Sequence, residues 1–296
     1  MIGLRYKRPA RTRRQLTRLV VAIILGTAVG TASIPAFGAY LVSTDAPTGL
    51  SASAASSTAC LPGATKVAPG VTTLPSVRHC TFLEIGDSLG TDLGEGLRLQ
   101  LEKNPGITLV VKTTVATGLT NWWFYNWSGH LKKFLTQYRP QLLIVFLGAN
   151  DEQAMVVNGH AAPFDTHAWR SKYESNVTTM MKEAAAVHCV VMWVGMPIMN
   201  PFGYRQKMQV INSIFSAAAL KMPDATFLST WEFMANAKGN FRFNARVNGK
   251  LQSIRTPDGI HLTYMGQNLL ATYVVTQLRL TSGLALKPAY PVRFTR

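Results

Sequence analysis

Short apolar runs alternate with longer amphipathic segments between residues 81 and 280. The apolar runs predict β-strands at 81–85, 107–112, 141–147, 188–194 and 225–229. The amphipathic segments predict helices at about 89–103, 127–138, 166–187, 205–221 and 263–280. Continuous apolar strands that alternate with helices are typical of an α/β domain whose parallel sheet is covered on both faces. The pattern therefore predicts a three-layer α/β/α domain with a five-stranded parallel sheet.

Polar residues and glycines follow the ends of several predicted strands. Ser88 follows the first strand within the sequence GDSLG, Gly118 lies in the loop after the second, and Asn150 follows the third within GAND. Asp258 and His261 precede the last helix, within DGIH. Ligands of open parallel sheets bind beyond the carboxyl ends of the strands. We therefore expect these five residues to meet at one edge of the sheet.

Serine, histidine and aspartate in this arrangement are typical of nucleophilic catalysis. A serine hydroxyl is a poor nucleophile at neutral pH, so a catalytic serine needs a general base and donors for the oxyanion that it creates. Asp258 precedes His261 by three residues, so the carboxylate can hold the ring while the ring takes the proton. Taken singly, the pieces have structural interpretations: a serine that caps a helix, turn-forming residues in a loop, and a structural histidine. Their combination in one order favours a serine hydrolase.

These blocks resemble the SGNH hydrolase superfamily, also called the GDSL esterase/lipase family, from about Phe82 to Leu280. Together with the sequence WVGMP at 193–197, they are most similar to a bacterial extracytoplasmic branch long filed as a domain of unknown function. The resemblance implies an SGNH/flavodoxin-like fold and the hydrolysis of esters. No spacing of Cys and His indicates a metal site, and we expect no cofactor.

The resemblance also implies a role for each residue. Ser88 would attack an ester carbonyl, His261 would accept its proton, and Asp258 would orient His261. The backbone N–H groups of Ser88 and Gly118 and the side-chain amide of Asn150 would bind the oxyanion. Glycine suits its position because the backbone must approach the substrate closely and because glycine tolerates positive φ.

Other polar and aromatic residues lie beside these motifs. Asp87 and Asp151 flank the site residues, and we interpret both as turn and hydrogen-bonding residues rather than as acids in the reaction. Residues 231–256 are rich in Lys and Arg and predict either a rim that selects an anionic or glycan substrate or a surface hairpin. Five aromatic residues follow Gly118, and we expect some to line the pocket and others to belong to the core: Trp122, Trp123, Phe124, Tyr125 and Trp127.

The N-terminal part has the pattern of a membrane anchor. Residues 1–18 carry seven positive charges and no acid, and the 23 residues of 19–41 carry no charge. This length can span a bilayer, and the positive flank predicts a cytoplasmic N-terminus with the remainder of the chain outside. The alternative is a signal peptide cleaved near residues 36–39, where small residues lie. We expect the anchor because the apolar run is long for a signal peptide.

Composition divides the rest of the chain. Residues 42–76 are rich in Ser, Ala, Thr, Pro and Gly and predict a flexible stalk, 77–283 the SGNH domain, and 284–296 a C-terminal tail. Outside the cytoplasm Cys60 and Cys80 could pair as a disulfide. Cys189 lies in an apolar strand, so we expect it to be a free core thiol.

The net charge of +16 also bears on binding partners. Removal of the seven N-terminal cations leaves +9, which indicates either affinity for anionic cell-surface polymers or an ordinary basic surface. No basic stretch interleaved with aromatics matches a nucleic-acid-binding module, so nucleic acid is not an expected partner.

Three functions fit these observations. The first is a membrane-tethered extracytoplasmic serine esterase that cleaves acyl groups, above all O-acetyl groups, from a cell-envelope glycan. The second is an O-acyltransferase that passes the acyl group from the same acyl-enzyme to a sugar hydroxyl. The third is an envelope binding protein without catalysis, which the complete set of Ser88, Gly118, Asn150, Asp258 and His261 argues against.

Overall fold

The central sheet contains five parallel strands. The computed structural model describes residues 79–282 and 284–295. The strand order is β2–β1–β3–β6–β7. The strands are β1 (Cys80–Gly86), β2 (Ile107–Thr113), β3 (Leu142–Phe146), β6 (Val190–Val194) and β7 (Ala225–Leu228). All four pairings between neighbours are parallel, as the sequence predicts.

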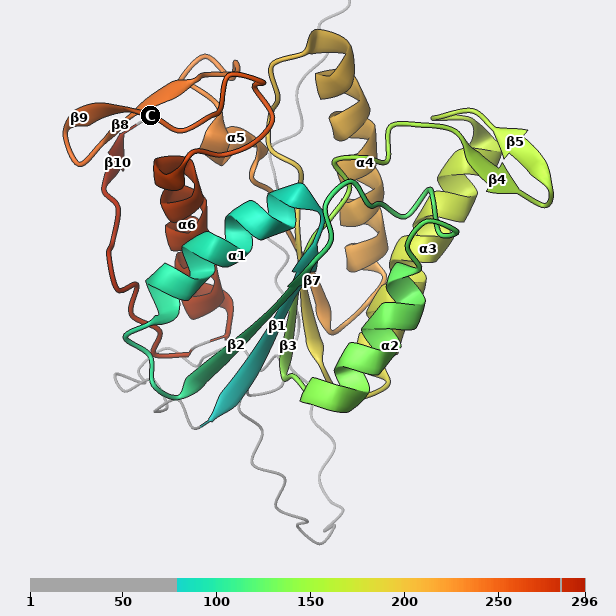
Figure 1. Cartoon of the computed structure of the whole chain (residues 1–296), viewed down its shortest axis with the longest axis horizontal. Coiled ribbons are helices and arrows are strands. Elements are labelled where there is room, and N and C mark those ends of the chain that lie inside the picture. Colours follow the sequence, from blue (N-terminus) through green and yellow to red (C-terminus); the bar gives the residue numbers. More distant parts are fainter. Residues whose placement is uncertain (1–78, 283, 296) are drawn as a thin grey trace, which may run out of the picture. The chain divides into compact units, whose positions relative to one another are not determined.

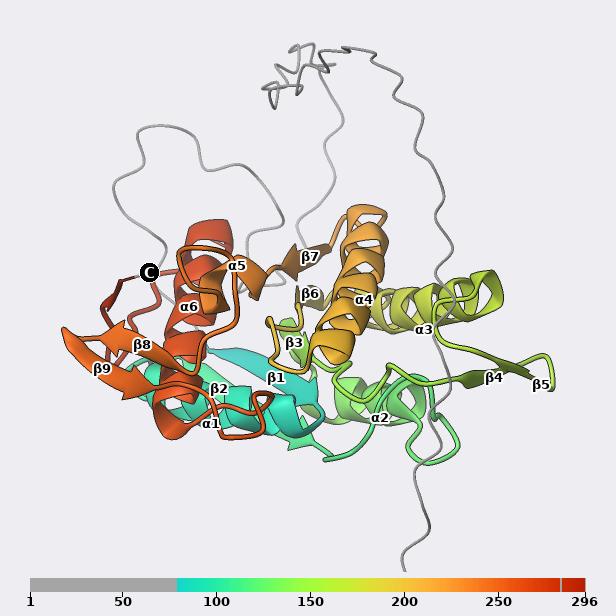
Figure 2. The ribbon, with the colours of Figure 1, turned by 90° about the horizontal axis from the view of Figure 1, so that it is seen from above.

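Helices cover both faces of this sheet, as the apolar strands require (Figures 1 and 2). The helices α1 (Ser88–Leu101) and α6 (Tyr264–Ser282) pack against each other on one face. The other face carries α2 (Trp127–Tyr138), α3 (His167–Ala185) and α4 (Phe202–Leu220). The leucines that recur along α1, Leu89, Leu93 and Leu97, are fully buried. The predicted three-layer α/β/α architecture is therefore confirmed for the described residues.

The strand order places a topological switch point between β1 and β3. The chain runs from β1 outward to β2, then returns to the other side of β1 to form β3. The last residues of these strands, Gly86 and Phe146, are direct partners across the sheet. Loops that leave neighbouring strands in opposite directions open a crevice at the carboxyl edge. Ser88 and Asn150 follow these two strands.

Two hairpins add small sheets that the sequence analysis does not predict. The first joins β4 (Met155–Val157) and β5 (His160–Ala162), and the second joins β8 (Asn244–Val247) and β9 (Lys250–Ser253). Both turn on Asn-Gly, and φ is 51° and 80° in the first pair and 50° and 79° in the second. Positive φ at both positions is the requirement of a type I′ turn. Residues 231–256 thus contain a surface hairpin, preceded by the short helix α5 (Trp231–Met234).

The C-terminal residues pack onto the domain. Leu284 and Leu286 are buried, and β10 (Phe294–Thr295) pairs with β8. Asn104 and Lys287 exchange two hydrogen bonds of 2.8 and 2.9 Å, which fasten this segment to the end of α1. Residues 284–295, predicted as a tail, therefore contribute to the core.

Several expectations concern residues outside the described part. The predicted anchor at 19–41, the stalk at 42–76 and Cys60 all lie there, so the anchor and the Cys60–Cys80 disulfide stay predictions. Within residues 79–282 and 284–295, no helix combines the length and the apolar character that a membrane crossing requires. Cys189 is a buried free thiol, as predicted.

Candidate active site

Ser88 begins α1 at a sharp turn after β1. The turn needs glycine at position 86, because a Cβ there would lie 2.2 Å from the carbonyl oxygen of Phe146. Asp87 caps the helix, and its Oδ1 accepts a hydrogen bond of 2.9 Å from the backbone N–H of Leu89. The predicted strand, turn and helix therefore carry Ser88 to the carboxyl edge of the sheet.

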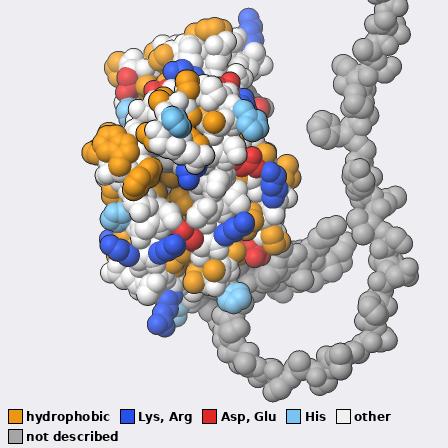
Figure 3. All heavy atoms as spheres, turned by 90° about the vertical axis from the view of Figure 1, so that its right-hand side faces the viewer, with side chains coloured by type: hydrophobic (Ala, Val, Ile, Leu, Met, Phe, Trp, Pro, Cys, Tyr) orange, Lys and Arg blue, Asp and Glu red, His pale blue; other side chains and the backbone are white. Residues whose placement is uncertain are grey.

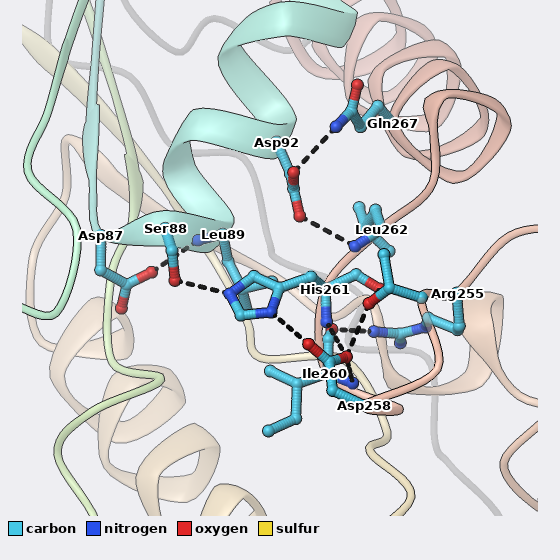
Figure 4. Close-up of polar contacts among 11 residues, drawn as sticks. Asp87, Ser88, Leu89, Asp92, Arg255, Asp258, Ile260, His261, Leu262 and Gln267 are labelled. Carbon is cyan, nitrogen blue, oxygen red and sulfur yellow. Dashed lines mark hydrogen bonds and ion pairs between the residues drawn. The ribbon is translucent and has the colours of Figure 1, made fainter.

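Asp258, His261 and Ser88 form a continuous chain of hydrogen bonds (Figure 4). His261 Nε2 lies 2.9 Å from Ser88 Oγ, and His261 Nδ1 lies 2.7 Å from Asp258 Oδ2. A carboxylate only accepts hydrogen bonds, so the ring carries its proton on Nδ1 and Nε2 accepts from the Ser88 hydroxyl. The structure brings the three side chains together in the predicted geometry.

Asp258 is held in its ionised form by its hydrogen bonds. Partial desolvation acts to raise its pKa, but hydrogen bonds from the His261 ring, the Thr256 hydroxyl and the backbone N–H groups of Ile260 and His261 outweigh it. The pKa of Asp258 is therefore lowered. A carboxylate that stays charged can stabilise the imidazolium formed when His261 takes a proton.

Asp92 and Gln267, which have no predicted role in the site, hold the His261 loop. Asp92 Oδ2 accepts a 2.8 Å bond from the Leu262 N–H, and its Oδ1 accepts one from the amide of Gln267 (Figure 4). Asp92 lies one helical turn beyond Ser88, so it ties the nucleophile's helix to the loop that carries the base. That spacing of four residues was the signal available in the sequence.

Arg255 supports the same loop from the other side. It is 2% exposed and donates to the carbonyl oxygens of Ile260 and Ile198, at 2.6 and 2.9 Å. Burial lowers the pKa of Arg255 to about 9. This cation of the basic 231–256 segment therefore has a structural role.

The oxyanion side is built from the loops after β2 and β3. Asn150 Nδ2 donates a 2.9 Å hydrogen bond to the carbonyl oxygen of Thr117, which leaves its second hydrogen for a ligand. A Cβ on Gly118 would lie 2.1 Å from Asp151 Oδ1. Glycine is thus required at 118 by the close approach of a buried carboxylate, and φ there is not positive.

Asp87 and Asp151 fix these loops through buried hydrogen bonds, as predicted. Asp87 Oδ2 accepts from the N–H groups of Gly148 and Ala149, at 3.0 and 2.9 Å. Asp151 accepts from the N–H and hydroxyl of Thr120, at 2.9 and 3.0 Å, and from the Tyr173 hydroxyl at 2.8 Å. These bonds link the Asn150 loop to the serine turn on one side and to the Gly118 loop on the other.

Burial raises the pKa of both carboxyl groups. The pKa of Asp87 rises to about 6, because desolvation outweighs the three backbone hydrogen bonds. Desolvation likewise raises the pKa of Asp151. Glu84, in β1 beneath α1, is fully buried, and desolvation followed by repulsion from Asp87 raises its pKa well above the usual value. Burial therefore favours the protonated form of Glu84.

One of the aromatic residues after Gly118 belongs to the core, as expected. Trp127 is 2% exposed and belongs to the core, whereas Trp122, Trp123 and Phe124 are exposed. Within the described ranges, no group of three or more His, Cys, Asp or Glu side chains is arranged to hold a metal ion.

Comparison with known proteins identifies a family. The family described as "Protein of unknown function (DUF459)" matches residues 81–277, and no curated protein matches the sequence. Similar solved structures include a putative acylhydrolase from Bacteroides fragilis NCTC 9343, with 17% identity, 70% of this chain and 91% of that chain covered, and a TM-score of 0.48. A GDSL-like lipase from Bacteroides thetaiotaomicron VPI-5482 has 16% identity, 70% and 92% coverage, and a TM-score of 0.47.

A catalytic mutant of an acetylxylan esterase from Geobacillus stearothermophilus has 14% identity, covers 74% of this chain and 100% of that chain, and has a TM-score of 0.49. With all three TM-scores below 0.5, these likenesses support no argument about activity. The family match spans well over half of the chain, with the strand before Ser88 at one end and helix α6 at the other. The chain therefore belongs to the DUF459 family.

Proposed function

We propose that this protein is a serine esterase of the SGNH type that cleaves acyl esters through an acyl-enzyme on Ser88. The observation that carries the proposal is the hydrogen-bonded chain from Asp258 through His261 to Ser88, with distances of 2.7 and 2.9 Å. A serine that only capped α1 would need neither partner. An envelope binding protein without catalysis would not require hydrogen bonds between these three side chains.

The acylation step follows from the geometry. Ser88 Oγ bonds to the ester carbonyl carbon while its proton passes to His261 Nε2, and Asp258 stabilises the resulting imidazolium. The N–H groups of Ser88 and Gly118 and the free hydrogen of Asn150 donate to the oxyanion. When the carbon–oxygen bond to the leaving alcohol breaks, His261 returns its proton to the alcohol oxygen.

Deacylation repeats these steps with water. His261 takes a proton from water as the water oxygen bonds to the acyl carbon. Collapse of the second oxyanion breaks the bond between the acyl carbon and Ser88 Oγ, His261 returns its proton to Ser88 Oγ, and the carboxylic acid leaves. A sugar hydroxyl in place of water would give transfer instead. Adding acceptor sugars to the assay and measuring acylated sugar against free acid separates esterase from acyltransferase.

The experiment compares wild type with Ser88→Ala. We expect the wild type to hydrolyse 4-nitrophenyl acetate and to bind a fluorophosphonate probe covalently at Ser88, and the variant to do neither while keeping its circular dichroism spectrum and melting temperature. Labelling at another residue, or near-normal hydrolysis by the purified variant, would disprove the assignment.

The substrate and location form part of the same proposal. The basic residues 1–18 and the uncharged 19–41 support an uncleaved signal anchor with the catalytic domain outside the cytoplasm. There, acetyl esters of a cell-envelope glycan are the substrate that we propose.

Full-length protein should remain with membranes in high salt, and a fragment beginning near Ser57 should be soluble and active. Release by salt alone, or a mature N-terminus beyond Gly38, would favour a cleaved signal.

A further inference from the structure

A pocket lies beside Gly118, between the start of α2 and the middle of α3. Its volume is about 290 Å³, close to the lower end of the range of about 300–1,000 Å³ that is usual for small-molecule sites. Its lining includes Gly118, Trp122, Tyr125, Asn126, Lys172 and Asn176. Gly118, which supplies a proposed oxyanion donor, belongs to this lining, so the pocket adjoins the oxyanion side of the site.

One wall of the pocket is bonded to the oxyanion side. The Trp127 indole N–H donates a 3.1 Å hydrogen bond to the hydroxyl of Thr117, whose carbonyl oxygen accepts from Asn150. Asn176 donates to the carbonyl oxygen of Leu119, at 3.1 Å, and so holds the other end of the Gly118 loop. The pocket is therefore part of the same rigid assembly as the proposed oxyanion donors.

The lining offers polar groups that have no partner among the described residues. These are the Tyr125 hydroxyl, the Asn126 amide nitrogen, the Ser175 hydroxyl and the Lys172 ammonium group, while Asn176 retains a free amide oxygen. An aliphatic acyl chain would make no hydrogen bonds to these groups and would desolvate the half-buried ones, Tyr125 and Asn176, which is unfavourable. A ligand rich in hydroxyl groups would satisfy them.

Three aromatic side chains also line the pocket. Trp122 is 61% exposed at the pocket mouth, while Tyr125 is half-buried and Trp127 is buried. Figure 3 views the side of the molecule that carries α2 and α3, and hydrophobic side chains gather there on the surface. A sugar ring has an apolar face of C–H groups and an edge of hydroxyl groups, so it matches a lining that combines indole faces with amides and hydroxyls.

The charge of the pocket lining further limits which sugars can bind. Lys172 is its one charged residue among the described residues, and no carboxylate lines the pocket. A positively charged amino sugar would be repelled by Lys172, whereas a neutral or acidic sugar would not.

We propose that this pocket binds a glycosyl unit next to the esterified sugar, so that the substrate is an acylated oligosaccharide or polysaccharide of neutral or acidic sugars. This inference rests on the proposed esterase function, because the neighbouring unit is placed by the ester at Ser88. The pocket acts as a positioning subsite: it holds the chain while the oxyanion donors hold the carbonyl.

Binding can be measured without turnover. The Ser88→Ala protein should bind neutral trisaccharides from a panel of pentoses, hexoses and N-acetylhexosamines, detected by tryptophan fluorescence and calorimetry. The additional change Trp122→Ala should weaken the best ligand about tenfold, which corresponds to about 1.4 kcal/mol. Trp123→Ala is the matched control, because Trp123 is the next residue, is 68% exposed and does not line the pocket. It should leave binding unchanged.

Kinetics of the otherwise wild-type protein give an independent measure. Trp122→Ala should raise KM for an acetylated oligosaccharide about tenfold at similar kcat, a larger loss than for 4-nitrophenyl acetate, which has no sugar to place in the pocket. Lys172→Gln should improve binding of deacetylated chitotriose relative to N-acetylchitotriose, since it removes the repelling charge. A shift of Trp122→Ala from acetyl towards octanoyl aryl esters, without an effect on sugars, would identify an acyl pocket and overturn the inference.

Failure of the subsite and failure of the esterase are distinguishable. If Ser88 reacts with the fluorophosphonate probe but Trp122→Ala and Trp123→Ala behave alike with every sugar, the subsite is disproved and the esterase stands. If Ser88 does not react and no ester is cleaved, the proposed function is disproved and this inference with it.

Discussion

The two sides of the candidate site use carboxylates in opposite ways. Asp258 and His261 lie on an open loop, with side chains 45% and 38% exposed, whereas Asp87 and Asp151 are fully buried. The exposed carboxylate has a lowered pKa and the buried pair have raised ones. Water and several donors keep the first charged, while burial works against charge on the others. The same residue type thus serves charge stabilisation on one side and loop positioning on the other.

The largest expected effect is on the open side. Asp258→Asn should lower kcat about ten-thousand-fold, because an amide no longer selects the tautomer with the proton on Nδ1. The free energy of unfolding should change little, since the side chain is exposed. Equilibrium denaturation beside esterase kinetics measures both. If Asp258→Asn lost much stability but kept a normal kcat, Asp258 would be a structural residue rather than part of the catalytic machinery.

On the buried side, the larger effect should be on stability. Asp151→Asn leaves donors from Thr120 and Tyr173 without a full acceptor, so the free energy of unfolding should fall by about 4 kcal/mol. Urea denaturation measures it. Tyr173→Phe removes one donor and keeps the carboxylate, so it should cost only about 1 kcal/mol. Equal losses in the two variants would show that Asp151 does not organise the loop.

Asn150 lies between these extremes. Asn150→Ala should lower kcat by about a hundredfold to a thousandfold with little change in KM, because its free hydrogen is used mainly in the transition state. Steady-state kinetics on 4-nitrophenyl acetate test this. A loss confined to KM would make Asn150 a substrate-binding residue instead.

The raised pKa of Asp87 predicts a pH dependence of stability. The folded state binds the proton more tightly than the unfolded state, so the free energy of unfolding falls as pH rises from about 4 to about 6. The shift from 3.8 to about 6 corresponds to about 3 kcal/mol. The raised pKa of Glu84 also lowers the free energy of unfolding as pH rises. Asp87→Asn should remove the contribution of Asp87 to this dependence of unfolding free energy on pH. An unchanged slope would contradict the raised pKa.

Asp92 should have the smallest effect. Asp92→Ala releases the Leu262 N–H and loosens the loop behind His261, so kcat should fall about tenfold while KM stays similar. Glu95→Ala, on the exposed face of the same helix, is the control and should leave both unchanged. If Asp92→Ala also behaves like wild type, the loop is positioned without this bond.

The parts predictable from sequence are those fixed by local pattern. All five strands of the main sheet follow from apolar runs, and the predicted helix at 127–138 has the bounds of α2. Ser88 and Asn150 follow from their place after such strands, and His261 from its spacing to Asp258. The two hairpins could also have been predicted from the sequence, because Asn158-Gly159 and Asn248-Gly249 are strong turn signals.

Contacts between distant segments were not predictable. The sequence does not distinguish Arg255 from a surface cation. Its buried role follows only from its hydrogen bonds to the carbonyl oxygens of Ile198 and Ile260. The packing of Leu284 and Leu286 likewise depends on where α1 ends, through the pair Asn104 and Lys287. No periodicity within either segment encodes these partners, which are set by the tertiary fold.

The exposure of the Asp258–His261 loop bears on the physical form of the substrate. An enzyme whose base lies at the bottom of a tunnel must thread a chain end, and it processes a polymer from its termini. Here His261 stands at the rim with over a third of its side chain in solvent. Under the proposed function, a long glycan can lie across this rim and present an ester from the middle of its length, so that de-esterification does not depend on free chain ends.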